Sequence, residues 1–320
     1  SLAFNISGPA CLGVAAIYNY NRKILFSQLN SMLLAMGLPI ISTTMYLILY
    51  TPDLKTILTS TGSNLETSGG FGPNQVATLL GIGMFIFFSR LILESRTKLM
   101  FVINLIIIFN ISYRGLVTFS RGGVFTGIAM ITIFMFVLYW YANAKTKNFI
   151  IVLSVVAVIL GGFIWTYSVL QTGGMIENRY ANKDARGREK SDRLGGREQI
   201  AETELKMFME NPIWGIGVGK NKEYREEMTG IVAASHNEIT RLLAEHGAFG
   251  VAALVILLFT PLILYFNNRE HIFLLPFFIF WLLTINHAAM RIAAPAFIYA
   301  LTLLKVRFVD ETTIPGESVK

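Results

Sequence analysis

The sequence predicts an all-α fold: a polytopic membrane helix bundle with a large, partly helical loop outside the membrane. Only 15% of the 320 residues are charged and 53% are hydrophobic, whereas a soluble domain is about 25% charged. About nine stretches are apolar over roughly the 20 residues that a membrane-crossing helix needs. One polar stretch, residues 171–247, holds 12 of the 27 Lys and Arg residues and 13 of the 20 Asp and Glu residues.

The apolar stretches divide the chain into parts. Residues 1–170 form N-terminal membrane helices, 171–247 the polar loop, 248–308 C-terminal membrane helices and 309–320 a polar tail. The first stretch is interrupted by Gly8-Pro9, and the last ones are interrupted by Asn286, His287 and Arg291. In chain order, the expected spans lie at about 3–20, 29–50, 75–93, 99–117, 123–143, 148–170, 248–266, 271–286 and 289–306.

The distribution of basic residues predicts the orientation. If the N-terminal end lies outside, the inner connections hold eleven Lys and Arg residues and the short outer connections hold four. Because Lys and Arg gather in short cytoplasmic loops, loop 171–247 is expected on the periplasmic or extracellular face and the tail in the cytoplasm. The charge of the long loop itself does not affect this assignment.

Composition also argues against several classes of function. The formal net charge of +7 does not indicate a nucleic-acid partner, because most basic residues outside the loop lie between apolar stretches. The single cysteine, Cys11, excludes an intramolecular disulfide and a cysteine-based metal site. No outward-facing group of His, Asp and Glu has the spacing of metal ligands, and Glu202 and Glu204 lie on different faces of their helix. We therefore expect neither a metal nor another cofactor.

The strongest catalytic candidate is His236, in the sequence Ser235-His236-Asn237-Glu238. This spacing matches a capping box, with Ser235 as the N-cap of a helix that ends at His246-Gly247. His236 would then be the first helical residue, where the positive end of the helix disfavours the imidazolium form. A neutral imidazole there could accept a proton. The alternative is a polar histidine on a capped surface helix.

Arginines at the outer ends of the spans suggest an anion site. Arg114 and Arg121 end consecutive spans, Arg291 lies near the start of the last one, and Arg197 lies in the loop. Charged side chains at a membrane boundary often extend towards water and have no further role. Gly122-Gly123, however, would leave the Arg121 guanidinium accessible to a ligand. The forked donors of arginine suit phosphate oxygens. Such a cationic pocket facing a neutral histidine would suit a diphosphate.

Two further motifs favour structural roles. Gly215-x-Gly217-x-Gly219 follows the helix stop Asn211-Pro212 and has the wrong spacing for a dinucleotide loop, so a turn that folds the loop back is expected. Phe71-Gly72-Pro73-Asn74 ends a polar connection, and Asn74 is expected to cap the helix that follows.

These residues resemble the O-antigen ligase family, whose superfamily includes O-antigen polymerases and protein O-oligosaccharyltransferases. The resemblance covers most of the chain from about residue 70. The matching stretches are Phe71–Asn74, Thr118–Gly123, Gly196-Arg197, Asn211–Gly219, Ser235–Glu238 and Glu245–Gly247.

The resemblance implies a GT-C-like fold in the bacterial inner membrane with its active site on the periplasmic face. It implies metal-independent transfer of a glycan from an undecaprenyl-diphosphate donor to a lipid A-core sugar. By this resemblance His236 would activate the acceptor hydroxyl, and Arg121 and Arg197 would bind the diphosphate. About twelve spans are usual in the family and about nine are expected here, so an N-terminal truncation is expected. The other residues expected to contact substrate are Asn74, Arg114, Asn237, Arg241 and Arg291.

Other functions remain open at this point. A polymerase or a protein O-oligosaccharyltransferase would use the same chemistry on another acceptor. A lipid-linked glycan transporter or binder belongs to a different class and would need polar residues along a path through the membrane. Ionisable residues are nearly absent from the span centres and gather at the outer ends, which favours an outward-facing site among membrane lipids.

Overall fold

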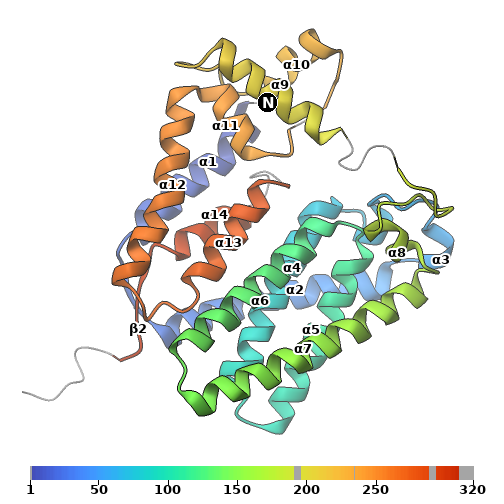
Figure 1. Ribbon diagram of the computed structural model, residues 1–320, viewed down its shortest axis with the longest axis vertical. Helices are drawn as coiled ribbons and strands as arrows, with labels where there is room; N and C mark the ends of the chain where they lie inside the picture. The colour runs from blue at the N-terminus through green and yellow to red at the C-terminus, as the bar shows by residue number, and fades with distance from the viewer. Residues whose placement is uncertain (1, 191–195, 234, 288–292, 310–320) are drawn as a thin grey trace, which may run out of the picture.

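The computed structural model describes residues 2–190, 196–233, 235–287 and 293–309, with side chains from residue 7 onward. The described chain is mostly helical, as predicted (Figure 1). Two short strands are present, β1 Lys23–Leu25 and β2 Lys305–Arg307. The helices are α1 Leu2–Asn19, α2 Phe26–Tyr50, α3 Leu54–Ile57, the 3-10 helix η1 Glu66–Ser68, α4 Pro73–Leu93, α5 Lys98–Val117, α6 Arg121–Tyr141, α7 Ala144–Gln171, α8 Met175–Tyr180, α9 Arg197–Glu210, α10 Asn221–Thr229, α11 Glu238–His246, α12 Ala248–Asn267, α13 Leu274–Ile285 and α14 Ala293–Leu301.

The protein is a multi-pass membrane helix bundle. In the described residues, six segments are long and apolar enough to cross a membrane: α2, Glu66–Leu93 with α4, α5, α6, α7 and α12. The first predicted stretch forms α1, which is not among the six. The last two predicted stretches form α13, with 12 residues, and α14, with 9 residues. At about 1.5 Å per residue, α13 reaches roughly 18 Å, less than the ~30 Å hydrocarbon core of a bilayer.

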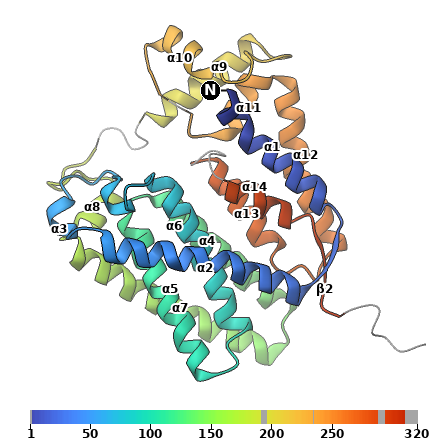
Figure 2. The same ribbon diagram turned by 180° about the vertical axis from the view of Figure 1, so that it is seen from behind.

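Helix α4 lies at the centre of the bundle, and 78% of its most apolar window is buried. It packs against α2, α5 and α6, while α13 packs against α6 and α14 (Figures 1 and 2). Helix α1 packs against α14, so the two ends of the described chain share one side of the bundle. Helix α7 is the least buried of the six segments, with 11% of its window buried, and it lies over α5 and α6.

Glycines allow α4 and α6 to approach closely. A Cβ added at Gly123 would lie 2.2 Å from the backbone of Ala77, and one at Gly81 would lie 2.3 Å from the Gly123 carbonyl oxygen. Gly127, one turn after Gly123, would meet the Gly81 oxygen at 2.9 Å. Small residues four apart allow this backbone contact between membrane helices. The contact places the beginning of α6 beside α4.

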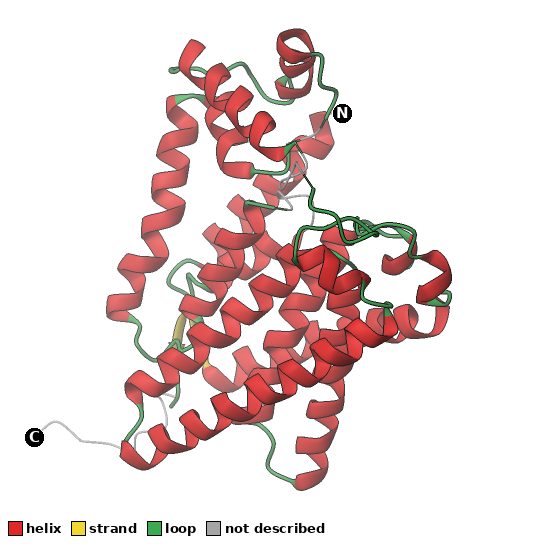
Figure 3. Ribbon diagram, turned by 45° about the vertical axis from the view of Figure 1, so that its right-hand side comes forward, coloured by secondary structure: helices red, strands yellow, loops and turns green. Residues whose placement is uncertain are grey.

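The two strands are the exception to the all-α prediction. β1 and β2 pair in parallel, with Lys23 opposite Lys305 and Leu25 opposite Arg307 (Figure 3). The side chain of Asn268, which follows α12, holds β2 in place, because it donates to Leu304 O at 2.6 Å and accepts from Val306 N at 3.2 Å. Such short strands carry little sequence signal of their own.

The described residues of the polar stretch 171–247 form four helices, in agreement with the prediction of a partly helical loop. Helix α8 packs beside the end of α7, and its Ile176 is fully buried. Helices α9, α10 and α11 pack against one another beyond the end of α12 (Figure 1). The candidate residues of the loop therefore lie at the end of the bundle where α6 begins.

Candidate functional site

Two arginines predicted to bind diphosphate lie near each other in the structure. Arg121 is the first residue of α6 and Arg197 is the first residue of α9, and neither helix has a side-chain N-cap. Burial lowers the pKa of Arg197, and the charge of Arg121 lowers it further. Uncapped helix N-termini present unpaired backbone N–H groups and a partial positive charge, so each arginine adds to an anion-binding helix end.

Arg179, which the sequence did not suggest, joins this pair. It lies in the last turn of α8, and its Nε donates to the Phe119 carbonyl oxygen at 3.0 Å. Its pKa is lowered mainly by burial and then by the charges of Arg121 and Arg197. In the part of the chain that the structure describes, none of the three arginines forms an ion pair with a carboxylate. We call these three residues the arginine cluster.

His287 lies against the start of α6. A Cβ added at Gly122 would fall 2.3 Å from its Cδ2. Its Nδ1 is 2.8 Å from the Leu283 carbonyl oxygen and must donate to it, which leaves the lone pair on Nε2. Burial lowers the pKa of His287, and the charge of Arg197 lowers it further. His287 is therefore a neutral imidazole beside the arginine cluster.

The glycines after Arg121 have a different role from the predicted one. They were expected to leave the Arg121 guanidinium accessible. Instead, Gly122 accommodates the ring of His287, and Gly123 accommodates the backbone of α4. Both therefore allow close packing, and Arg121 itself is half-buried.

Asn74 connects two of the motifs, although it is not a helix cap. Helix α4 begins at Pro73 with Gly72 as its N-cap, so the prediction of Asn74 as the cap was wrong. Proline favours the first helical position, which moves the start of the helix one residue earlier than Asn74 would set it. The Asn74 side chain instead accepts a hydrogen bond from the Ser120 hydroxyl at 2.8 Å. This bond joins the beginnings of α4 and α6 next to Arg121.

The segment that carries His236 also differs from its prediction. Helix α11 begins at Glu238 with Asn237 as its N-cap, so Ser235 is not the cap and His236 precedes the helix. Asn237 Oδ1 accepts from Ile239 N at 2.9 Å. Asparagine caps as well as serine does, and the Ser235 hydroxyl bonds to the Glu204 carboxylate at 3.3 Å instead. The helix ends at His246, followed by Gly247, as predicted.

The end of α13 links the His236 segment with the arginine cluster. Ile239, three residues after His236, packs against a cluster of buried residues that includes Trp281 and Ile285. His287 follows Ile285 by two residues and lies against Gly122. Helix α11 therefore contacts the end of α13, and the start of α6 contacts His287 just after that end.

Three other predicted site residues lie elsewhere or have protein partners. Arg114 is only 3% exposed, and its guanidinium donates to Thr51 Oγ1 at 2.5 Å and to the Thr67 carbonyl oxygen at 3.3 Å. Arg241 pairs with Glu238 at 2.8 Å on its own helix. Arg291 lies outside the described residues.

The glycine-rich turn folds back as predicted. Gly215, Gly217 and Gly219 all have positive φ angles, of 68°, 95° and 79°. Ile216 N donates to the Ala244 carbonyl oxygen at 2.9 Å, and Gly217 N donates to that of Glu245 at 3.1 Å. The turn thus satisfies carbonyl groups at the end of α11.

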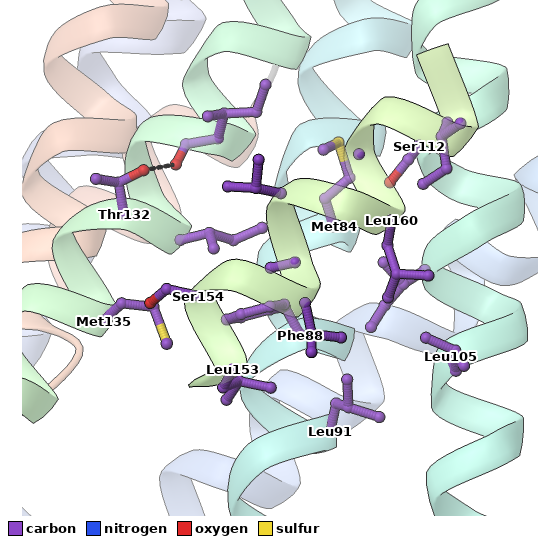
Figure 4. A pocket seen from close by; sticks show the side chains of 18 of the residues that line it. Met84, Phe88, Leu91, Leu105, Ser112, Thr132, Met135, Leu153, Ser154 and Leu160 are labelled. Carbon is purple, nitrogen blue, oxygen red and sulfur yellow. Dashed lines mark hydrogen bonds between the residues drawn. The ribbon is translucent and has the colours of Figure 1, made fainter. Parts of the chain in front are cut away.

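An apolar cavity of about 940 Å³ lies between α4, α5, α6 and α7 (Figure 4). Its few polar groups include the hydroxyls of Ser112, Thr132 and Ser154. Val124 and Trp165 line it at the end where α6 begins. Val124 is one helical turn from Arg121, so the cavity reaches the neighbourhood of the arginine cluster.

Tyr180 connects that end of the cavity with the cluster. The rings of Trp165 and Tyr180 are 5.0 Å apart. Burial raises the pKa of Tyr180 to about 12, while the nearby charges of Arg121 and Arg179 act to lower it. An amphiphile with an apolar chain and an anionic head would match this combination of surfaces.

Comparison with known families identifies the segment that holds most of this site. The model of one family, described as O-antigen ligase, matches residues 106–255. The chain carries an O-antigen ligase family domain. No curated protein and no solved structure matches the chain.

The O-antigen ligase match includes the arginine cluster and His236. The family is one of glycan-transferring membrane enzymes that use lipid-linked glycans, which agrees with a multi-pass protein of the inner membrane. Asn74 and His287 lie outside the matched segment, yet the fold brings both to the beginning of α6.

Sequence reasoning missed Arg179 and His287 for different reasons. Arg179 lies in a run of mixed charge that resembles a solvated surface, and only the fold shows its contact with Phe119. His287 was noted only as an interruption of an apolar stretch. Its position directly after α13 was the one available signal, since ionisable residues at the end of a membrane helix often mark a site.

Proposed function

We propose that this O-antigen ligase family protein transfers a glycan from undecaprenyl diphosphate to a sugar hydroxyl of lipid A-core. The observation that carries the proposal is the arginine cluster, in which three guanidinium groups lie near the uncapped start of α6 and have no carboxylate partner among the described residues. Uncompensated cations of this kind suit a diphosphate anion.

His236 acts as the general base in this proposal. It removes the proton from the acceptor hydroxyl as the oxygen attacks the anomeric carbon of the donor. The bond from that carbon to the diphosphate oxygen breaks, and the negative charge that grows on the diphosphate is stabilised by Arg121, Arg179 and Arg197. The displacement needs no metal, because the guanidinium groups supply the positive charge.

The apolar cavity between α4, α5, α6 and α7 holds the prenyl chain of the donor. Its volume of about 940 Å³ is at the upper end of the roughly 300–1,000 Å³ of small-molecule pockets. Because its end at Val124 and Trp165 lies near Tyr180 and the cluster, one lipid can place its chain in the cavity and its diphosphate at the arginines.

The distribution of basic residues supports a periplasmic site in the inner membrane. Asn74 supports the cluster through Ser120, while Asn237 and Arg241 border the acceptor side near His236. A glycan polymerase and a protein O-oligosaccharyltransferase differ from this proposal only in the acceptor. A transporter of lipid-linked glycans would not need His236.

The deciding experiment offers the purified protein a lipid-linked glycan together with lipid A-core, a second lipid-linked glycan or an acceptor protein. We expect lipid A-core to gain the mass of the glycan, in the presence of EDTA as well as in its absence. A His236→Ala protein should retain less than roughly 1% of the transfer rate. A gain of mass by another acceptor would overturn the ligase assignment, and full activity of His236→Ala would overturn the base assignment.

A further inference from the structure

A buried ion pair lies directly behind the segment that carries His236. Glu204 of α9 and Arg225 of α10 both have fully buried side chains, with Arg225 Nη2 2.5 Å from Glu204 Oε1. Asn221, one turn before Arg225, donates to the same carboxylate oxygen at 2.9 Å. No sequence motif indicated a functional role for either charged residue.

The pair holds the chain on both sides of Ala234. Arg225 Nη1 donates to the Ala233 carbonyl oxygen, and the Ser235 hydroxyl donates to Glu204 Oε2 at 3.3 Å. The residues between the end of α10 and Asn237 that the structure describes have no regular secondary structure. Their position therefore depends strongly on side-chain bonds of this kind.

Glu204 also fixes the start of α11. Its Oε2 accepts from the Thr240 hydroxyl, while its Oε1 accepts from Arg225 and Asn221. One carboxylate thus joins α9, α10, α11 and the residue next to His236. Ala233 and Ser235 lie outside α9 and α10, so the bonds to them show that the pair does more than join these two helices.

We propose that Glu204 and Arg225 are positioning residues that hold the His236 imidazole at the acceptor hydroxyl. This inference rests on the proposed role of His236 as the base. Burial makes the arrangement rigid, because neither charged group can exchange its partner for water. A displacement of about 1 Å in a catalytic group can cost on the order of 10²-fold in rate.

The test replaces the pair by apolar residues of similar size, Glu204→Leu with Arg225→Met. Removing both charges together leaves no buried unpaired ion, so the protein should still fold. We expect kcat for glycan transfer to fall on the order of 10²-fold, while KM for the lipid-linked donor stays close to wild type. The melting temperature should fall, because Asn221, Ser235 and Thr240 lose their bonds to Glu204, but the variant should stay folded at the assay temperature. Glu270→Gln is the matched control, because it removes the partly exposed pair with Arg307 at the opposite end of the bundle and should leave kcat unchanged.

Guanidinium rescue tests the bond to the backbone separately. Arg225→Ala leaves a space that fits a guanidinium ion between Glu204 and the Ala233 carbonyl oxygen. Guanidinium chloride at millimolar concentration should raise kcat of Arg225→Ala severalfold, and sodium chloride at the same ionic strength should not. Equal effects of the two salts would contradict the positioning role.

A mutant cycle separates this inference from the proposed function. In a His236→Ala background the apolar double replacement should cause no further loss of kcat, because residues that act through one group are not additive. If His236→Ala is inactive but the double replacement alone keeps wild-type kcat, the positioning role is wrong and the proposed function stands. If His236→Ala keeps full activity, His236 is not the base, and the positioning role of Glu204 and Arg225 is wrong with it.

Discussion

The imidazole of His287 and the backbone of Gly122 are in such close contact that no side chain fits between them. A Cβ at Gly122 would lie within 2.3 Å of Cδ2 and 2.7 Å of Nε2 of the ring. Because Gly122 follows Arg121 directly, a displaced ring would also shift the arginine cluster. This contact gives the first testable prediction.

Gly122→Ala should reduce glycan transfer on the order of 10²-fold, because the new methyl group displaces the ring of His287 and with it the start of α6. Truncating the ring should restore the space, so Gly122→Ala with His287→Ala should transfer faster than Gly122→Ala alone. Gly162→Ala is the control, since nothing lies within 4 Å of its added Cβ. Initial transfer rates of the purified variants test this, and a double variant no faster than Gly122→Ala would contradict it.

Arg121→Lys keeps the positive charge but loses the forked pair of donors. We expect kcat/KM to fall roughly 10²-fold, the usual cost of removing one donor to a developing anion. Arg188→Lys is a suitable control, because the Arg188 side chain is 70% exposed and pairs with Asp184 four residues earlier. Wild-type kinetics in Arg121→Lys would mean that Arg121 does not bind the diphosphate.

Arg179→Gln tests the member of the cluster that the sequence did not suggest. Loss of one charged hydrogen bond should raise KM for the lipid-linked donor about tenfold or more. The dependence of KM on salt should also weaken, because one cation fewer attracts the diphosphate. Arg188→Gln should leave KM unchanged. A donor KM that is equal in Arg179→Gln and wild type would remove Arg179 from the site.

His271 should make stability depend on pH. It lies fully buried in the turn between α12 and α13, with Nε2 donating to the Leu301 carbonyl oxygen at 2.9 Å and no partner for Nδ1 in the described chain. Burial lowers its pKa to about 4, so the unfolded chain takes up the proton at a higher pH than the folded protein does. The free energy of unfolding should therefore be unaffected by this group above about pH 6.5 and fall as pH decreases towards 4, by about 3 kcal/mol.

The measurement is denaturant unfolding of wild type and His271→Gln in detergent between pH 8 and pH 4, a range of about four units around the unperturbed pKa. The glutamine can still donate to Leu301 but cannot titrate. Burial also lowers the pKa values of His246 and His287, so the informative quantity is the difference between the two proteins. If the difference in the free energy of unfolding between wild type and His271→Gln does not change with pH, His271 is not responsible for the pH dependence.

Much of the fold could be predicted because composition and apolar length carry that information. Each of the six segments that are long and apolar enough to cross a membrane overlaps one of the predicted stretches. The errors concern lengths and ends. Helix α13 is shorter than predicted, and α14 ends at Leu301 instead of near residue 306, because apolar composition does not show where a helix stops. The predicted start of the last stretch lies outside the described residues.

The candidate site was predictable only in part. Arg121, Arg197 and His236 were suggested by their positions next to glycine or serine motifs, and the structure brings Arg121 and Arg197 together. The cap of α11 was misassigned, because Ser235 and Asn237 are both good caps and only the buried Glu204 decides between them. Contacts between residues far apart in sequence, such as Glu204 with Arg225, leave no periodic signal.

The parallel pairing of β1 with β2 has a consequence for how the protein is made. Lys23 is synthesised long before its partner Lys305, because helices α2 to α14 lie between them in the chain. Closing so long a loop is entropically costly until the intervening helices have assembled. The pairing can therefore form only after these helices have been synthesised. A nascent chain halted before Lys305 would keep the packing of α1 on α14 but lack the strand pairing that holds the connection between α1 and α2.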